Sequence, residues 1–244
     1  MSMVEANKLT KVYSGSTVVD NLNLSIEKGQ IFGFLGPNGA GKTTTILMLL
    51  GLTEPTSGSA NIGGYNSTRE SLKVKRISGY IPEKVGFYSD LSARENLIYT
   101  ANLNGIFGEE ADKNVAAALE NVGLKERADD KVSDFSKGMK QRLAIADILV
   151  KQPEVAFLDE PTSGIDPEGI TQILDLIKKV ARENNMTMIM SSHQLNQVER
   201  ICSHAAIMNK GKLIASGSLD ELSKKTRGDQ VIIEVQLAEI NQDI

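Results

Sequence analysis

The sequence Gly-Pro-Asn-Gly-Ala-Gly-Lys-Thr, residues 36–43, decides the fold of this chain. It follows a short apolar run at 31–35, of the kind expected for a buried strand. It precedes residues 44–50, whose composition predicts a helix that ends near Gly51. A strand, a glycine-rich turn and a helix in this order predict a loop whose backbone N–H groups face an anion.

Residues 36–43 match the pattern G-x-x-x-x-G-K-T at every fixed position. Glycines allow the backbone N–H groups to turn inward around phosphate oxygens, because no Cβ stands in the way. Lys42 adds a positive charge for the β- and γ-phosphates, and the Thr43 hydroxyl can bind Mg²⁺. The alternative is a glycine-rich turn with an incidental lysine, but at ordinary glycine frequency a chance match arises about once in 100 chains of this length. The pattern therefore predicts a nucleotide-binding loop.

Composition narrows the class of protein. The chain has 244 residues, which suits one large domain or a core with a subdomain. With 41% hydrophobic and 24% charged residues, the composition is that of a globular protein. The 27 Lys and Arg against 31 Asp and Glu leave a net charge of −4, which argues against a broad basic face. We therefore expect no nucleic-acid partner.

No segment has the pattern of a membrane span or a signal peptide. The longest nearly pure apolar run, 46–52, is far shorter than the ~20 residues that a spanning helix needs. The single cysteine, Cys202, excludes an internal disulfide. The two histidines, His193 and His204, are too few for a histidine metal site. These features predict a cytosolic chain.

Apolar periodicity predicts an α/β fold in which a mostly parallel sheet is covered by helices. A helical insertion at about 84–152 interrupts the alternation, and Ser92 and Glu95 within it have capping-box spacing. Strands are expected at 7–13, 18–26, 31–35, 76–81, 155–158, 187–191 and 205–208, and helices at 93–103, 109–122, 138–151, after Pro167 and at 194–202.

The C-terminal tail, 226–244, does not fit this alternation. Residues 231–237 have the pattern of one strand after a polar linker. Because a lone strand cannot bury itself, this strand either pairs with the sheet or opens a small, incomplete accessory domain.

Two acids follow the apolar run 155–158, and they are the expected partners of the nucleotide loop. Ligands of a parallel sheet gather at the carboxyl ends of its strands, where Asp159 and Glu160 would lie. Asp159 would hold Mg²⁺ through water, and Glu160 would polarise the water that attacks the γ-phosphate. The alternative is that both acids only cap a strand and begin the turn at Pro161.

The loop by itself does not identify the enzyme. A GTPase would need an N-K-x-D motif, and the nearest candidate, 209–212, has lysine in place of aspartate. A small-molecule kinase stays open on the loop alone. The segment 134–143 carries further information, because Ser136 stands just before a predicted helix and Gly138 removes a side chain there. This helix start could face a second anion, or Ser136 could be an ordinary N-cap.

Here the sequence resembles the ATP-binding subunits of ABC transporters. Residues 135–139, Phe-Ser-Lys-Gly-Met, are similar to the L-S-G-G-Q signature of that family, with Ser136 and Gly138 at matching positions. The resemblance extends over about residues 3–225, with every motif in family order. It implies an ABC ATPase domain over residues 1–225: a P-loop NTPase core, an N-terminal antiparallel β subdomain and the inserted helical subdomain.

The resemblance also assigns roles. Tyr13 matches the aromatic residue that stacks on adenine, residues 163–166 match the loop that crosses to a partner subunit, and His193 matches the histidine that touches the γ-phosphate. Read alone, Tyr13 could be a core aromatic and His193 a structural histidine. The implied ATP contacts are Tyr13, Gly36, Pro37, Asn38, Gly39, Ala40, Gly41, Lys42, Thr43, Thr44 and Asp166, with Ser136 and Gly138 contacting the ATP of the partner chain.

Catalysis would rest on Lys42, Glu160 and His193, and Mg²⁺ would be held by Thr43, Glu83 and Asp159. Glu83 stands where the family usually has glutamine, and Met139 replaces the glutamine of the signature. The metal contact of Glu83 and the signature contact of Met139 therefore differ from the family pattern. These two substitutions, with Lys137, resemble the drug, antibiotic-resistance and sodium exporter branch, the ABC-2 type.

The expected function is that of an ATP-binding and ATP-hydrolysing subunit that powers export through a separate integral membrane permease. Two copies would form a head-to-tail homodimer with ATP and Mg²⁺ at the interface. The subunit would be cytoplasmic and peripheral on the inner face of the cell membrane, and it would dock through the helical insertion and the loop at 83–88. The alternatives are an Fe–S assembly ATPase or, from another class, a P-loop kinase.

Overall fold

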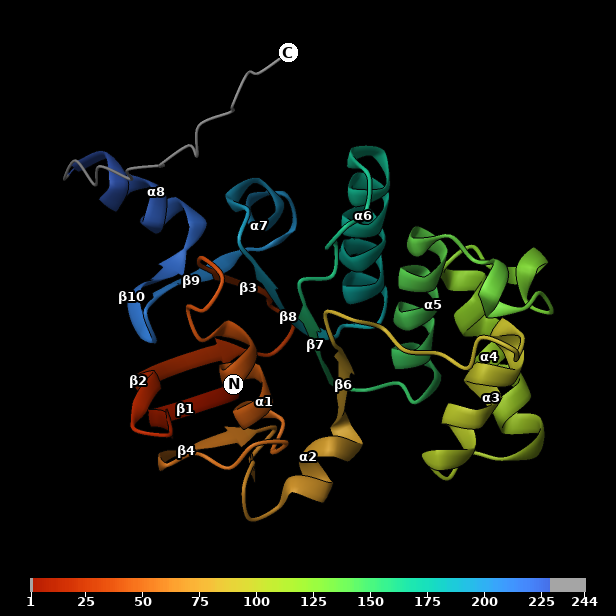
Figure 1. Ribbon diagram of the computed structural model, residues 1–244, viewed down its shortest axis with the longest axis horizontal. Helices are drawn as coiled ribbons and strands as arrows, with labels where there is room; N and C mark the ends of the chain where they lie inside the picture. The colour runs from red at the N-terminus through yellow and green to blue at the C-terminus, as the bar shows by residue number, and fades with distance from the viewer. Residues whose placement is uncertain (1, 229–244) are drawn as a thin grey trace.

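Alternating apolar residues at the N-terminus form an antiparallel sheet in the computed structural model, which describes residues 2–228 (Figure 1). Its strands lie in the order β2-β1-β4-β5, and each neighbouring pair is antiparallel. The strands are β1 (Ser2–Tyr13), β2 (Ser16–Glu27), β4 (Ser57–Ile62) and β5 (Tyr65–Asn66). The expected N-terminal antiparallel β subdomain is thereby confirmed.

The second sheet carries the nucleotide loop. Its order is β10-β9-β3-β8-β7-β6, with all pairs parallel except β9 and β10. The parallel pairing brings the carboxyl ends of β3, β8 and β7 to one edge. The strands are β3 (Ile31–Leu35), β6 (Ser78–Ile81), β7 (Val155–Asp159), β8 (Thr187–Ser192), β9 (His204–Asn209) and β10 (Lys212–Ser218).

Helices cover the sheet and form a lobe beside it (Figure 1). The capping box predicted from Ser92 and Glu95 is present at the start of α3. The helices are α1 (Lys42–Leu49), α2 (Ser71–Ile77), α3 (Ala93–Leu103), α4 (Gly108–Asn121), α5 (Lys137–Val150), α6 (Pro167–Glu183), α7 (Leu195–Ile201) and α8 (Leu219–Gly228), with short 3₁₀ turns at Lys125–Arg127 and Val132–Asp134.

The strand predicted at 76–81 is wrong at its start. Residues 76 and 77 belong to α2, and β6 begins only at Ser78, where pairing with Val155 starts. The helix packs its buried Val74 against the core. Backbone pairing across the sheet, which local composition does not report, therefore sets the boundary.

The central sheet separates two apolar cores. On β7, Ala156 and Leu158 belong to the core under α5 and α6, whereas Val155 and Phe157 face the antiparallel sheet and α1. This two-residue alternation is the pleat of a strand that is buried on both faces.

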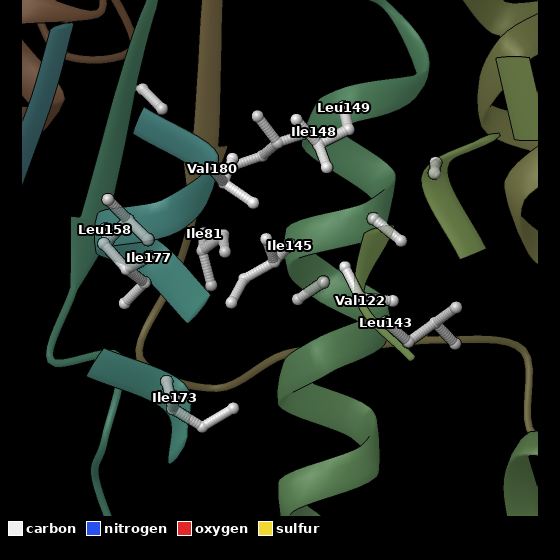
Figure 2. Packing of buried hydrophobic residues seen from close by; sticks show 14 of the residues in the cluster. Ile81, Val122, Leu143, Ile145, Ile148, Leu149, Leu158, Ile173, Ile177 and Val180 are labelled. Atoms are coloured by element: carbon white, nitrogen blue, oxygen red, sulfur yellow. The ribbon is translucent and has the colours of Figure 1, made fainter. Parts of the chain in front are cut away.

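Helix α5 connects the helical lobe to the sheet. It contacts α3, α4, α6 and β6. Figure 2 shows Ile145 and Ile148 of α5 pointing toward Ile81 of β6 and toward Ile177 and Val180 of α6. One apolar cluster thus runs from the edge of the sheet into the lobe.

Among residues 2–228, no helix is long and apolar enough to cross a bilayer. The domain bounds 1–225 and the insertion bounds 84–152 stay predictions. The strand expected at 231–237 lies outside the described residues.

Close packing of α5 on β6 makes a testable prediction. A Cβ at Gly79 would lie 2.6 Å from Ile148 Cγ2. We therefore expect Gly79→Ala to lower the free energy of unfolding by about 1–3 kcal/mol through overpacking.

Urea denaturation measures this loss, and Gly86→Ala is the matched control, because a Cβ at Gly86 meets nothing within 4 Å. Combining Gly79→Ala with Ile148→Ala should cost less than the sum of the two single changes. Additive losses would contradict the contact.

Candidate functional site

The glycine-rich loop is held at the edge of the parallel sheet, between β3 and α1. The Gly36 N–H donates to the carbonyl of Ser192, 3.2 Å away, at the end of the neighbouring strand β8. Gly41 has a φ of +99°, and a Cβ there would lie 2.7 Å from the Val18 carbonyl oxygen. This position therefore requires glycine both for its backbone angle and for the close approach of β2.

Lys42 lies inside the loop rather than in solvent. Its side chain is only 6% exposed. The ammonium donates to the Gly36 carbonyl at 2.8 Å and to the Pro37 carbonyl at 3.3 Å. It also lies 3.2 Å from Glu160 Oε1. A buried positive charge thus joins the loop to the acid that follows β7.

A cavity of 320 Å³ opens beside this charge. It brings together most of the residues that the sequence assigned to ATP and its metal, including Glu83, Glu160 and His193. The lining residues are Val18, Asn38, Gly39, Ala40, Gly41, Lys42, Thr43, Thr44, Glu83, Glu160, Ser163 and His193. Neither Val18 nor Ser163 was assigned a contact from the sequence.

The two acids after β7 occupy different environments. Asp159 is buried, and its Oδ1 accepts a hydrogen bond from Ser191 Oγ at 2.5 Å. Glu160 has a left-handed φ of +47° and lines the cavity. Its backbone N–H donates to the same Ser191 Oγ at 2.9 Å. A left-handed backbone on a glutamate costs energy and is typical of functional sites.

His193 lies at the end of β8 and contacts Glu160. The distance from its Nδ1 to Glu160 Oε2 is 2.9 Å, and the histidine side chain is 46% exposed. By contrast, His204 begins β9, and its Nδ1 lies 3.1 Å from Ser203 Oγ. Only His193 therefore joins the candidate site.

Hydroxyl and carboxylate oxygens near the loop suit a hard cation. Thr43 lines the cavity, and Asp159 lies at the end of β7. Burial and the negative charge of Asp159 raise the pKa of Tyr80 to about 12, so this neighbour stays a neutral phenol. Within residues 2–228, no group of three or more His, Cys, Asp or Glu could hold a metal. A magnesium ion here would depend on phosphate and water oxygens as well, which is its usual pattern.

Ser136, Gly138 and Asp166 lie apart from this cavity. They line a second cavity of 570 Å³, together with Lys137 and Gly164. Ser136 caps α5 by accepting from the Met139 N–H at 3.2 Å, and Asp166 caps α6 by accepting from the Gly169 N–H at 2.8 Å. The two cavities share no lining residue.

Tyr13 lines neither cavity. It ends β1 with 44% of its surface exposed, and the Lys11 ammonium lies 4.8 Å from its ring centroid. Its stacking on adenine stays a prediction.

Three polar residues of the site were not assigned a role from the sequence: Thr162, Ser191 and Gln197. All are buried, and they link the segment after β7 to β8 and to α7. The available signal was a pair of serines at the end of an apolar strand, since buried hydroxyls need partners.

Comparisons with known proteins agree with this geometry. A family model described as "ABC transporter" matches residues 19–163. The bacitracin transport ATP-binding protein BcrA of Bacillus licheniformis is 44% identical over 243 residues, which is 100% of this chain and 78% of that protein. The linearmycin resistance ATP-binding protein LnrL of Bacillus subtilis strain 168 is 41% identical over 240 residues, covering 98% and 76%.

Among solved structures, a dimeric ATP-binding cassette in a post-hydrolysis state, bound to ADP and Pi, matches with a TM-score of 0.80. Its sequence is 26% identical, and the match covers 89% of this chain and 99% of that one. The expected P-loop NTPase fold is thereby confirmed.

The Ser191 hydroxyl links Asp159 to the Glu160 backbone, so Ser191→Ala should leave two buried polar groups unpaired. We expect the free energy of unfolding to fall by about 1–3 kcal/mol. Urea denaturation of the full chain measures the change. Ser133→Ala is the control, because the Ser133 hydroxyl is exposed and contacts only Asp134. Equal stability of the two variants would contradict the bridge.

Proposed function

Because this chain belongs to the ABC transporter family and is an ATP-binding, ATP-hydrolysing subunit, we propose that the cavity beside residues 36–43 binds ATP with Mg²⁺ between two copies of the chain. The observation that carries the proposal is the convergence of Lys42, Glu160 and His193 on one cavity. Three elements that are distant in sequence supply these side chains.

The loop supplies positive charge and hydrogen-bond donors to the phosphates. Residues 38–41 and the first residues of α1 line the cavity, and Lys42 adds a full charge. In phosphoryl transfer most of the catalytic effect comes from positioning and charge stabilisation, so a buried lysine next to the γ-phosphate is well placed.

Glu160 orients and polarises the attacking water, and His193 assists it. The 2.9 Å contact between His193 Nδ1 and Glu160 Oε2 supports this pairing. The bond to Ser191 holds the Glu160 backbone, while contacts with Lys42 and His193 hold its carboxylate. His193 is also the residue that would reach the γ-phosphate.

Mg²⁺ would be held by Thr43 and Glu83, which line the cavity, and by Asp159, which is buried at the end of β7 and does not line it. When bound, the ion would neutralise charge on the β- and γ-phosphates. The carboxylate of Glu83 adds a negative charge where the family usually has an amide.

Two copies are needed because the phosphate loop and the Ser136 segment of one chain line separate cavities. In a head-to-tail homodimer, the α5 N-terminus of one copy would face the ATP on the loop of the other. Residues 163–166 support this arrangement, since Ser163 lines the first cavity while Gly164 and Asp166 line the second.

The transported substrate class is proposed from the relatives. The names of BcrA and LnrL tie those proteins to bacitracin transport and linearmycin resistance. We infer export of a comparable compound through a separate permease, with this subunit on the inner face of the cell membrane. The comparisons do not favour the Fe–S assembly ATPase or the small-molecule kinase.

The helical lobe offers a surface for the permease. We define the apolar patch as Tyr88, Tyr99 and Leu103, which are all exposed. The two tyrosine rings pack edge to face at 5.2 Å, and Leu103 lies one turn beyond Tyr99 on α3. Exposed apolar clusters of this kind mark interaction sites.

A cavity of 270 Å³ is lined by Thr100 of α3, by Asn104 at the C-cap of this helix, by Ser78 and by Asp147. Burial raises the pKa of the Asp147 carboxyl, which shares a hydrogen bond with Thr100, while within the described part of the chain its Oδ1 and Ser78 Oγ are buried without a hydrogen-bond partner.

Glu160→Gln tests the catalytic assignment. The amide cannot accept a proton from water, so we expect kcat to fall about 10²–10⁴-fold while ATP stays bound and the dimer accumulates. Phosphate release and sedimentation measure the two effects. Glu154→Gln, an exposed change, is the control. Normal turnover by Glu160→Gln would remove Glu160 from the reaction.

The double change Tyr99→Ser and Leu103→Ser tests the docking surface. Removing the apolar contacts should reduce the fraction of tagged chain recovered with membranes of its native cells about tenfold or more, because interface hot spots of this type each contribute roughly 1–2 kcal/mol. ATP binding should be unaffected. Ile214→Ser, an exposed change on β10, is the matched control. Undiminished membrane recovery would place docking elsewhere.

A further inference from the structure

Helix α7 carries a glutamine that is almost completely buried. Gln197 is 3% exposed, although its amide has two donor hydrogens and an acceptor oxygen. Its Oε1 accepts from Thr162 Oγ1 at 2.8 Å and from Ser192 Oγ at 2.9 Å. Its Nε2 donates to Gln194 Oε1 at 3.1 Å. Three side chains therefore hold the amide, and each of them stands within two residues of Glu160 or His193 in the sequence.

These partners belong to two different segments of the chain. Thr162 lies between Glu160 and Ser163, in the segment after β7. Ser192 is the last residue of β8 and immediately precedes His193, and its hydroxyl also accepts the Gln194 N–H at 3.0 Å. One buried side chain thus joins the segment that carries the glutamate to the segment that carries the histidine.

The contacts close into a ring. Gln194 Nε2 lies 3.5 Å from His193 Nε2, and His193 Nδ1 lies 2.9 Å from Glu160 Oε2. The backbone connects Glu160 to Thr162, and the Thr162 hydroxyl donates to Gln197, which closes the ring. Both nitrogens of the imidazole therefore have a polar neighbour, and one of these neighbours, Gln194, is held by Gln197.

We propose that Gln197 is a positioning residue for ATP hydrolysis. It fixes the loop of Glu160 relative to the loop of His193, so that the two side chains keep their mutual distance while the nucleotide is bound. The proposal rests on the roles proposed above for Glu160 and His193. Gln197 touches neither the cavity nor the reacting atoms, since it does not line the cavity.

Gln197→Met tests the proposal, because methionine keeps the length of the side chain and removes every hydrogen bond. We expect kcat for ATP to fall roughly tenfold, since small misplacements of reacting groups are costly. KM should stay within about twofold, because the phosphate loop is not involved. Steady-state phosphate release by the full chain measures both values.

Gln197→Glu is the conservative variant. Its carboxylate still accepts from Thr162 and Ser192, and the Gln194 amide can turn to donate to it, so we expect most of the kcat to return. Glu199→Gln on the exposed side of α7 is the matched control and should behave as wild type.

Gln194→Ala opens the same ring at another point. If the ring acts as a unit, the double variant with Gln197→Met loses no more kcat than the larger single loss, whereas independent effects multiply. Multiplied losses, a rise in KM equal to the fall in kcat, or no rescue by glutamate would each overturn the proposal.

Thermal unfolding of each variant separates misfolding from misplacement. If Gln197→Met unfolds, Thr162→Val replaces it, because this change removes the hydrogen bond to Gln197 from the Thr162 side. We expect Thr162→Val to lower kcat selectively as well. A normal kcat would overturn the proposal. A wild-type chain without ATP hydrolysis would instead contradict the proposed function.

Discussion

The contact on which the site depends is the ion pair between Lys42 and Glu160, 3.2 Å long and largely hidden from solvent. It joins a loop after β3 to a residue after β7, and this is possible only because β8 lies between these strands in a parallel sheet. The Gly36 N–H bond to Ser192 supports the same edge from the strand between them. Parallel pairing therefore brings together the groups proposed to bind phosphate and to activate water.

Helix α5 gives the molecule a second organising element. Its first residues line the cavity of Ser136 and Asp166, and its last turns pack on β6 beside the cavity of Asp147. With 14 residues it is roughly 21 Å long. A rigid helix thus connects the surface proposed to meet the second copy with the surface proposed to meet the permease, and its apolar cluster couples both to the sheet (Figure 2).

Local patterns were enough for much of the fold. The capping box at Ser92 placed α3, because a cap is satisfied within one turn of its own helix. The run 31–35 placed β3 at its observed bounds. Residues 76–77 were misplaced, since a short segment with Val74 and Ile77 suits either a helix or a strand. Pairing with β7 settled that boundary, and pairing is not a local property.

The sequence by itself determined the phosphate loop, the acids after β7 and the signature segment, because each is a short pattern whose chemistry lies in consecutive residues. Only the tertiary structure decided which of them meet. It placed His193 against Glu160, kept Tyr13 outside the cavity and revealed the buried links of Ser191 and Gln197. The physical reason is that buried hydroxyls and amides take their partners from neighbouring strands and helices, and these neighbours are fixed only when the chain packs.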